Sequence, residues 1–219
     1  MIAIVDYGRG NLGSVEKAFG RVGMPAVVTQ DPKVVDDAEA VVLPGDGAFH
    51  DAMGSLQSLG LIAPLRACFE SERPFFGICL GYQLLFSESE EFGQGKGLDV
   101  IPGAVRRFPA TLKVPHMGWN QVEHRGDLRL FDGIPSGADF YFVHSYYPET
   151  SDTSLAVATC TYGITFPAAV GRGPLFATQF HPEKSQRWGI RMLENFAAFV
   201  REARSRAGRG AAEGEPRRP

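Results

Sequence analysis

Residues 74–86 read Pro74-Phe75-Phe76-Gly77-Ile78-Cys79-Leu80-Gly81-Tyr82-Gln83-Leu84-Leu85-Phe86. A short apolar run bounded by proline and glycine is typical of a strand that is buried on both faces. Just beyond this run, apolar side chains recur at helical spacing, at Tyr82, Leu85 and Phe86. The stretch therefore predicts a strand that turns into a helix, with Cys79 at the joint.

The cysteine at this joint has the surroundings of a nucleophile. Gly77 and Gly81 stand two positions to either side of Cys79, and a sharp strand-to-helix turn needs small residues there so that the two elements pack closely. A thiol at a helix N-terminus faces unpaired N–H groups, which favour the thiolate. Cys79 could instead be a buried structural cysteine, but a core strand would gain nothing from the flanking glycines.

A candidate base lies near the other end of the sequence. Residues 177–185 contain His181 and Glu183, separated by a single proline. His181 can accept the proton of Cys79 while Glu183 orients the ring and stabilises the imidazolium, as in a triad of nucleophile, base and carboxylate. We therefore assign the catalytic roles to Cys79, His181 and Glu183.

The composition limits the classes of function. The 219 residues, 44% of them hydrophobic, suit one α/β domain. The 22 basic and 25 acidic side chains give a net charge of −3, which does not favour nucleic acid or an anionic membrane as a partner. The sequence has no apolar stretch of about 18 residues for a membrane span, and its three cysteines lack the spacing of disulfides or metal ligands. We expect a cytoplasmic protein without a metal or cofactor.

A glycine-rich turn near the N-terminus suggests a different function. Residues 8–13 match the pattern G-x-G-x-x-G between a predicted strand at 1–6 and a helix, and Asp31 follows the next apolar run. This is the pattern of a dinucleotide-binding loop. We rank it below the thiol chemistry, because the rest of the chain leaves no room for a substrate domain. A tight turn without a ligand is the other interpretation.

A second glycine-rich turn, Pro44-Gly45-Asp46-Gly47, follows the apolar run 41–43. Such a turn after a buried strand can direct backbone N–H groups into a cleft, where they stabilise a tetrahedral oxyanion. We predict the oxyanion hole here. A carboxylate directed inward would repel the oxyanion, so we expect the side chain of Asp46 to face away.

The rest of the sequence predicts the fold class. Short apolar runs separated by turn residues in the second half predict an antiparallel extension of the sheet, while the acidic, glycine-rich residues 87–97 predict a loop. The fold class is therefore α/β, with three layers around a mainly parallel sheet. From Gln186 a helix carries apolar residues on one face. We assign residues 1–201 to the domain and 202–219, which lack aromatic and β-branched residues, to a disordered tail.

The stretches 77–83 and 181–185 together resemble the class I, or triad, glutamine amidotransferases, which hydrolyse glutamine and pass on ammonia. Three further stretches, 6–12, 115–120 and 141–147, resemble the glutaminase subunits of imidazole glycerol phosphate synthases. The resemblance covers residues 1 to about 200. It implies a flavodoxin-like fold and a heterodimer with a (β/α)8-barrel cyclase that acts in histidine biosynthesis.

The resemblance also implies roles for individual residues. The oxyanion loop would pair with the N–H of Leu80, and the implied substrate-binding residues are Gly45, Asp46, Gly47, Leu80, Gln83, Ser145 and Tyr146. Contact with the cyclase and the exit for ammonia are implied for Asn11, Trp119, Tyr141 and Lys184. His116 and His144 are expected to be structural or to face the substrate, because His181 already supplies the base.

These observations predict a glutaminase subunit that passes ammonia to a cyclase, which makes imidazole glycerol phosphate and AICAR. Ammonia in bulk water at neutral pH is mostly protonated and no longer nucleophilic, so it needs a sheltered path. The acceptor site is expected on another polypeptide. Three alternatives remain: the glutaminase subunit of a different ammonia-using synthase, a thiol hydrolase or peptidase of the same fold, and a dinucleotide-binding module.

Overall fold

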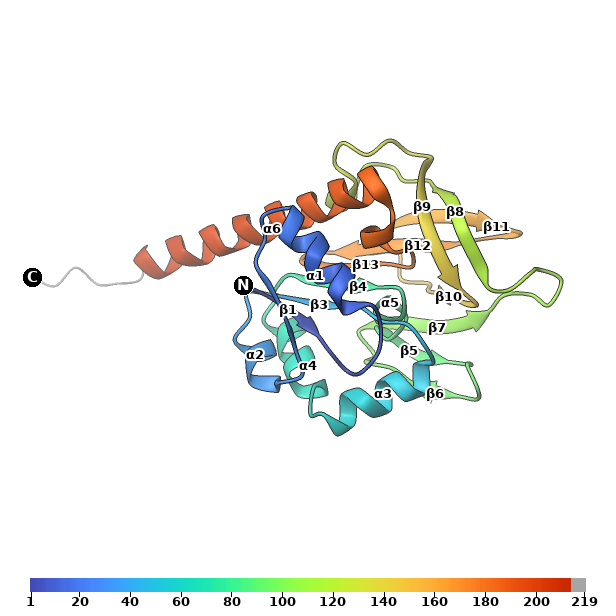
Figure 1. Ribbon diagram of the computed structural model, residues 1–219, viewed down its shortest axis with the longest axis horizontal. Helices are drawn as coiled ribbons and strands as arrows, with labels where there is room; N and C mark the ends of the chain where they lie inside the picture. The colour runs from blue at the N-terminus through green and yellow to red at the C-terminus, as the bar shows by residue number, and fades with distance from the viewer. Residues whose placement is uncertain (214–219) are drawn as a thin grey trace, which may run out of the picture.

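The computed structural model describes residues 1–213, and a seven-stranded sheet lies at its centre (Figure 1). Five of its strands are parallel: β1 (Ile2–Val5), β2 (Ala26–Thr29), β3 (Ala40–Leu43), β4 (Phe75–Ile78) and β13 (Leu175–Thr178). Two further strands continue the sheet with antiparallel pairing, β12 (Ile164–Arg172) and β11 (Ala156–Tyr162). The order β2-β1-β3-β4-β13 within this sheet is that of flavodoxin-like folds.

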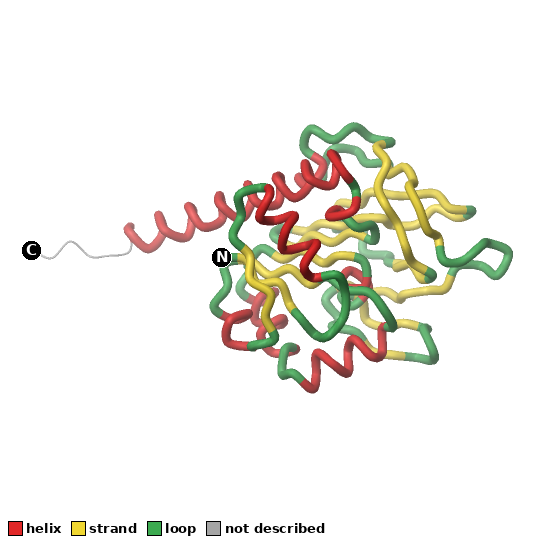
Figure 2. Tube along the Cα trace, in the orientation of Figure 1, coloured by secondary structure: helices red, strands yellow, loops and turns green. Residues whose placement is uncertain are grey.

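Helices cover both faces of the central sheet (Figures 1 and 2). One face is covered by α1 (Leu12–Arg21) and α6 (Gln186–Glu213), the other by α2 (Pro32–Asp36), α3 (Phe49–Ser58) and α4 (Ile62–Glu70). Because side chains alternate along a strand, Ile2 and Ile4 join the cluster with α1 and α6, while Ala3 and Val5 join the other cluster. The predicted three-layer α/β fold is confirmed.

The second half also builds two smaller sheets. A four-stranded sheet has the order β10-β7-β5-β6, and a two-stranded sheet pairs β8 with β9; their bounds are β5 (Phe86–Ser89), β6 (Gly95–Lys96), β7 (Ile101–Arg107), β8 (His116–Val122), β9 (Ala138–His144) and β10 (Tyr146–Glu149). The antiparallel extension is thus confirmed for β11 and β12, whereas the other strands leave the central sheet. The prediction of a loop at 87–97 is wrong at both ends, because Glu88 pairs with Lys96 and Ser89 with Gly95 across a short hairpin.

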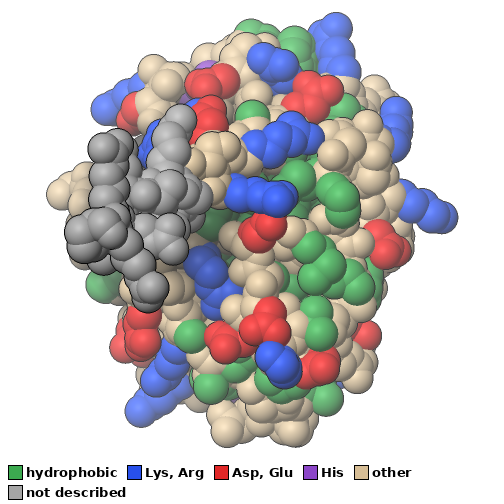
Figure 3. Space-filling view, turned by 90° about the vertical axis from the view of Figure 1, so that its left-hand side faces the viewer, with side chains coloured by type: hydrophobic (Ala, Val, Ile, Leu, Met, Phe, Trp, Pro, Cys, Tyr) green, Lys and Arg blue, Asp and Glu red, His purple; other side chains and the backbone are tan. Residues whose placement is uncertain are grey.

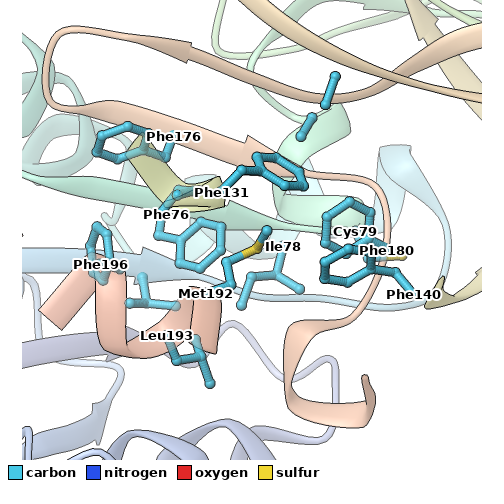
Figure 4. Close-up of a cluster of buried hydrophobic side chains, with 14 of the residues drawn as sticks. Phe76, Ile78, Cys79, Phe131, Phe140, Phe176, Phe180, Met192, Leu193 and Phe196 are labelled. Atoms are coloured by element: carbon cyan, nitrogen blue, oxygen red, sulfur yellow. The ribbon is translucent and has the colours of Figure 1, made fainter. Parts of the chain in front are cut away.

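Helix α6 packs one apolar face against the central sheet. Figure 4 shows Met192, Leu193 and Phe196 beside Phe76 and Ile78 of β4, and the rings of Phe76 and Phe196 are 5.2 Å apart. The predicted helix is confirmed, but the predicted disordered tail from residue 202 is corrected, since the helix continues to Glu213. Residues 214–219 of that tail lie outside the described residues.

Charged contacts hold the first turn beyond the predicted boundary. Glu202 accepts two hydrogen bonds from Arg129 of the short helix η1 (Arg129–Phe131), at 3.0 and 3.1 Å, and Arg204 lies 3.4 Å from Glu39. In the described part of the chain, no helix combines the length and hydrophobicity that a membrane span requires.

Candidate active site

The nucleophile candidate lies on a strained turn between β4 and the short helix α5 (Leu80–Gln83). Cys79 has φ 55° and ψ −106°, a positive φ that is rare for any residue with a side chain. The backbone fixes this conformation from both sides, because Cys79 N donates to Thr178 O at 2.8 Å and Gln83 N donates to Cys79 O at 3.2 Å. The turn is thus held by the neighbouring strand and by the helix that follows.

The glycines beside Cys79 are required by close backbone approach. A Cβ atom on Gly81 would fall on the carbonyl oxygen of Leu43, and a Cβ on Gly77 would lie 2.9 Å from the carbonyl oxygen of Gly81. This confirms the reason given for the glycine spacing. The helix is shorter than the spacing predicted, because Phe86 already begins β5.

The parallel pairing of β4 with β13 brings the base to the nucleophile. Their carboxyl ends lie side by side, with Thr178 opposite Ile78, and His181 follows β13 just before the short helix η2 (Pro182–Lys184). His181 Nδ1 lies 2.8 Å from Glu183 Oε1, and the two side chains are 6% and 3% exposed. The predicted dyad is present and buried.

The other ring nitrogen of His181 is available for chemistry. His181 Nε2 is buried and has no hydrogen-bond partner among the described residues. Burial alone would lower the pKa of His181, but the charge of the Cys79 thiolate and then the hydrogen bond and charge of Glu183 outweigh it and raise that pKa to about 10. His181 therefore favours the imidazolium form.

A cavity of about 400 Å³ opens over Cys79 and His181. Most of the predicted substrate-binding residues line it: Asp46, Gly47, Leu80, Gln83, Ser145 and Tyr146. Lys184 lines it as well, whereas Gly45 and Glu183 are not among the lining residues. A larger surface hollow of about 510 Å³ beside Glu88, Arg106 and Glu149 is lined by no cysteine or histidine.

Comparison with known families decides the assignment of this site. Residues 3–199 match the family "Glutamine amidotransferase class-I". The chain belongs to the class I glutamine amidotransferase family.

Individual relatives agree with this family. The protein named "Imidazole glycerol phosphate synthase subunit HisH" from Moorella thermoacetica is 55% identical over 202 residues, covering 92% of this chain and 96% of that protein. The protein of the same name from Geobacter sulfurreducens is 53% identical, with 89% and 97% covered. The solved glutaminase domain of Trypanosoma brucei CTPS with bound acivicin superposes with a TM-score of 0.68 at 16% identity, covering 92% and 93% of the two chains, which shows the shared fold.

The loop predicted to form the oxyanion hole borders the cavity at Asp46 and Gly47. Leu80 N–H donates to the carbonyl oxygen of Gly45 at 3.4 Å. The N–H group that the resemblance implies for the oxyanion is therefore hydrogen-bonded to this loop. The side chain of Asp46 is exposed at the rim.

Three of the four residues implied for the partner contact lie together beside this amidotransferase site. Trp119 is 47% exposed and packs edge-on against Tyr141, with ring centres 6.0 Å apart. Tyr141 O accepts a hydrogen bond from His181 N at 2.9 Å, so this face adjoins η2 and Lys184. Asn11 stands at the start of α1, where its side chain accepts Ser14 N–H at 3.3 Å and caps the helix.

The glycine-rich turn at residues 8–13 packs against the loop that borders the amidotransferase site. A Cβ on Gly10 would lie 3.2 Å from the Cα of Gly45, so this turn packs against the oxyanion loop. Asp31 accepts Lys33 N–H at 2.8 Å and caps α2, which occupies the carboxylate that a dinucleotide ribose would need. These contacts count against the dinucleotide interpretation.

Some residues of the site escaped the sequence-based prediction. Glu91 lines the cavity, its Oε2 accepts Phe49 N–H at 2.7 Å, and burial raises its pKa. Ser185 links η2 to β9, donating to His181 O and accepting from Tyr141 N at 3.0 Å. His116 and His144, expected to be structural or to face the substrate, form a buried hydrogen-bonded pair at 2.9 Å, and His144 borders the cavity. Glu91 could not have been found from the sequence, because a single glutamate in an acidic stretch gives no signal of a binding site.

Proposed function

We propose that this chain is the glutaminase subunit of an imidazole glycerol phosphate synthase. It hydrolyses L-glutamine to glutamate and ammonia, and the ammonia passes to a cyclase subunit that makes imidazole glycerol phosphate and AICAR in histidine biosynthesis. The observation that carries this proposal is the buried Cys79, His181 and Glu183 constellation in a chain 50–55% identical to several synthase subunits named HisH. That similarity favours this synthase over another ammonia-using enzyme or a thiol peptidase.

The geometry supports a two-step mechanism. The Cys79 thiolate attacks the side-chain carbonyl of glutamine, and His181 protonates the leaving nitrogen through Nε2, so that ammonia departs from a glutamyl thioester. Water activated by the same nitrogen then releases glutamate. The oxyanion needs the N–H groups of Leu80 and the Gly45–Gly47 loop, which become available once the Gly45 carbonyl has turned away.

The cavity offers groups for the rest of the substrate. Ser145, Tyr146 and Gln83 line it together with Cys79. Glu91 contributes a carboxylate that suits the α-ammonium group of an amino acid. These assignments follow from position and charge, and they extend the proposal to the substrate-binding residues Gly45, Asp46, Gly47, Leu80, Gln83, Ser145 and Tyr146.

The proposed partner is a (β/α)8-barrel cyclase that forms a heterodimer with this chain in the cytoplasm. Its docking surface would be the exposed side of β8 and β9, where Met117 and Trp119 are 62% and 47% exposed. Exposed apolar and aromatic side chains of this kind are common anchors of protein interfaces. Lys184 lines the cavity and Tyr141 packs against Trp119, so these two residues are the proposed wall of the ammonia exit.

The test uses the chain in complex with the cyclase subunit of the same organism. Cys79→Ala should lower glutamine-dependent formation of imidazole glycerol phosphate by roughly 10⁴-fold or more, while synthesis from added ammonium salts persists. Cys160→Ala is the matched control, because Cys160 is buried away from the cavity. Persistent glutamine hydrolysis by Cys79→Ala, or no use of glutamine by the wild-type complex, would contradict the proposal.

A further inference from the structure

A buried glutamine contacts the reacting sulfur. Gln179 directly follows β13, is fully buried, and its Nε2 lies 3.7 Å from Cys79 Sγ. The sulfur also forms a hydrogen bond with the backbone carbonyl oxygen of Val143, at 3.9 Å, and interacts with the neighbouring His181. A carbonyl can accept from a thiol but repels a thiolate. Gln179 therefore supplies an N–H donor that suits the thiolate form.

The orientation of the Gln179 amide follows from the carbonyl oxygen of Tyr146, which can only accept hydrogen bonds. The carbonyl oxygen of Tyr146 lies 3.0 Å from the Gln83 side chain, so the atom of Gln83 that faces it must be the NH2 group. The same NH2 group lies 3.0 Å from Gln179, whose facing atom must then be Oε1. The NH2 group of Gln179 is thereby turned toward Cys79.

A second branch holds the same Tyr146 carbonyl. His144 Nδ1–H donates to it at 2.8 Å, so His144 Nε2 is an acceptor and receives a hydrogen bond from His116 Nδ1–H at 2.9 Å. His116 Nε2 in turn accepts from Asn120 Nδ2 at 3.1 Å. Burial lowers the pKa of His144 to about 3 and that of His116 to about 4, so both rings stay neutral and each keeps one tautomer. This chain of hydrogen bonds, which starts at Asn120 of β8, holds the Tyr146 carbonyl in place.

We propose that Gln179 is a further catalytic residue, which donates its amide N–H to Cys79 Sγ and stabilises the attacking thiolate. The role rests on the proposed thiol chemistry at Cys79, and it is separate from the role of His181, whose Nε2 serves the proton transfers. Gln83 acts as a positioning residue in the same chain, because it orients the Gln179 amide in addition to bordering the substrate. A hydrogen bond to an anion is stronger than one to a neutral thiol, so Gln179 favours the reactive form.

The test measures how fast iodoacetamide alkylates Cys79 as a function of pH, without glutamine, in the full chain with its cyclase partner. Peptide mapping by mass spectrometry separates Cys79 from Cys68 and Cys160. Gln179→Met keeps a similar shape and removes the donor, whereas Gln179→Glu is isosteric and replaces the donor with a carboxylate. Both variants should slow alkylation at pH 7 by roughly tenfold and shift the rise of the profile to higher pH.

The matched control is Thr178→Val, one residue earlier and equally buried. Its hydroxyl donates to Phe180 O at 3.1 Å and does not touch the sulfur, so the alkylation profile should stay at the wild-type position. Gln83→Met should give an intermediate shift, since Gln179 then loses its orientation. Circular dichroism shows whether Gln179→Met folds. If it does not, the alkylation profile of Gln179→Glu tests the proposal.

The outcomes separate this role from the proposed substrate. A wild-type profile in the folded Gln179 variants, or an equal shift in Thr178→Val, would overturn the role of Gln179 even if the complex hydrolyses glutamine. A shift confined to the Gln179 and Gln83 variants would support it, even if glutamine proves to be the wrong amide substrate.

Discussion

At the scale of residues, the histidines at and beside the site have pKa values that are shifted in opposite directions. The pKa of His181 is raised to about 10, so its contribution to folding is present below the unfolded pKa of about 6.5 and is lost as pH rises through the folded value. The pKa values of His116 and His144 are lowered to about 4 and about 3 by burial. The unfolded chain takes up their protons below pH 6.5 while the fold does not, so these two destabilise the protein as pH falls.

This sign difference gives a pH prediction. In His144→Gln the amide can still donate to the Tyr146 carbonyl, but one buried neutral histidine is gone. Below about pH 6 the free energy of unfolding of the wild type should fall more steeply than that of the variant, by up to about 1.4 kcal/mol per pH unit. Urea unfolding at pH 7, 6 and 5 measures the slopes. Equal slopes would show that His144 is protonated in the fold.

Local patterns predict the residues whose chemistry is local. Cys79 stands between two glycines and His181 stands two residues from Glu183, so both groups are visible in a window of a few residues. Gln179 lies within one such window, yet its role depends on Gln83, which is 96 residues away. His116 and His144 are 28 residues apart and meet only because β8 pairs with β9 in register. Contacts of this kind arise from strand register, which no short motif encodes.

At the scale of elements, α6 is the one whose extent differs most from the prediction. Its buried face ends at Val200, and beyond it Arg201 donates to the Val22 and Gly23 carbonyl oxygens, both at 3.2 Å. These carbonyls lie just after α1, so Arg201 ties the last packed turn of α6 to the end of that helix. The ion pairs further along are exposed, and such pairs contribute little.

Two truncations test where α6 stops contributing to stability. A chain ending after Arg204 keeps the Arg201 and Glu202 contacts, so its melting temperature should match that of the full chain. A chain ending after Val200 loses them, and each kcal/mol lost should lower the melting temperature by about 2–4 °C. Differential scanning calorimetry of the three chains measures this. A clear loss for the longer truncated chain would mean that residues 205–219 dock on the domain.

The sequence predicts elements well where apolar residues set the period. The strands at the centre of the sheet and the packed part of α6 are of this kind. It fails at β5 and β6, because a hairpin of Phe86–Ser89 with Gly95–Lys96 is mostly polar and is stabilised by backbone pairing. It also overstates α5, since the apolar residues after Gln83 are buried by the smaller sheet and need no helix.

At the scale of the whole molecule, parallel strands bring distant segments to one edge. The turns after β1, β3, β4 and β13 all follow carboxyl ends of parallel strands, which is where doubly wound sheets place their sites. The two-stranded sheet of β8 and β9 then sets Trp119 and Tyr141 beside that edge. Figure 3 shows the end of the molecule that carries the C-terminal part of α6, on the opposite side from β8 and β9, and acidic and basic side chains are interspersed there. With a net charge of only −3 we expect apolar anchors, more than electrostatic steering, to govern docking.

The last prediction concerns the coupling of the two reactions across that face. Trp119→Ala should weaken binding of the cyclase, because exposed aromatic anchors often contribute about 2 kcal/mol or more to an interface. Titration calorimetry measures this. The control is Lys33→Ala on α2, where Lys33 is paired with Asp37, and the same variant is the control for the product measurement below.

Tyr141→Ala and Lys184→Ala should leave binding largely intact and open the wall between the cavity and solvent, so that part of the ammonia escapes. Glutamate and imidazole glycerol phosphate are then measured in the same reaction. The wild type and Lys33→Ala should form near-equal amounts of the two products, and the Tyr141 and Lys184 variants should form excess glutamate. Equal products in both variants would place the path of ammonia elsewhere than between Tyr141 and Lys184.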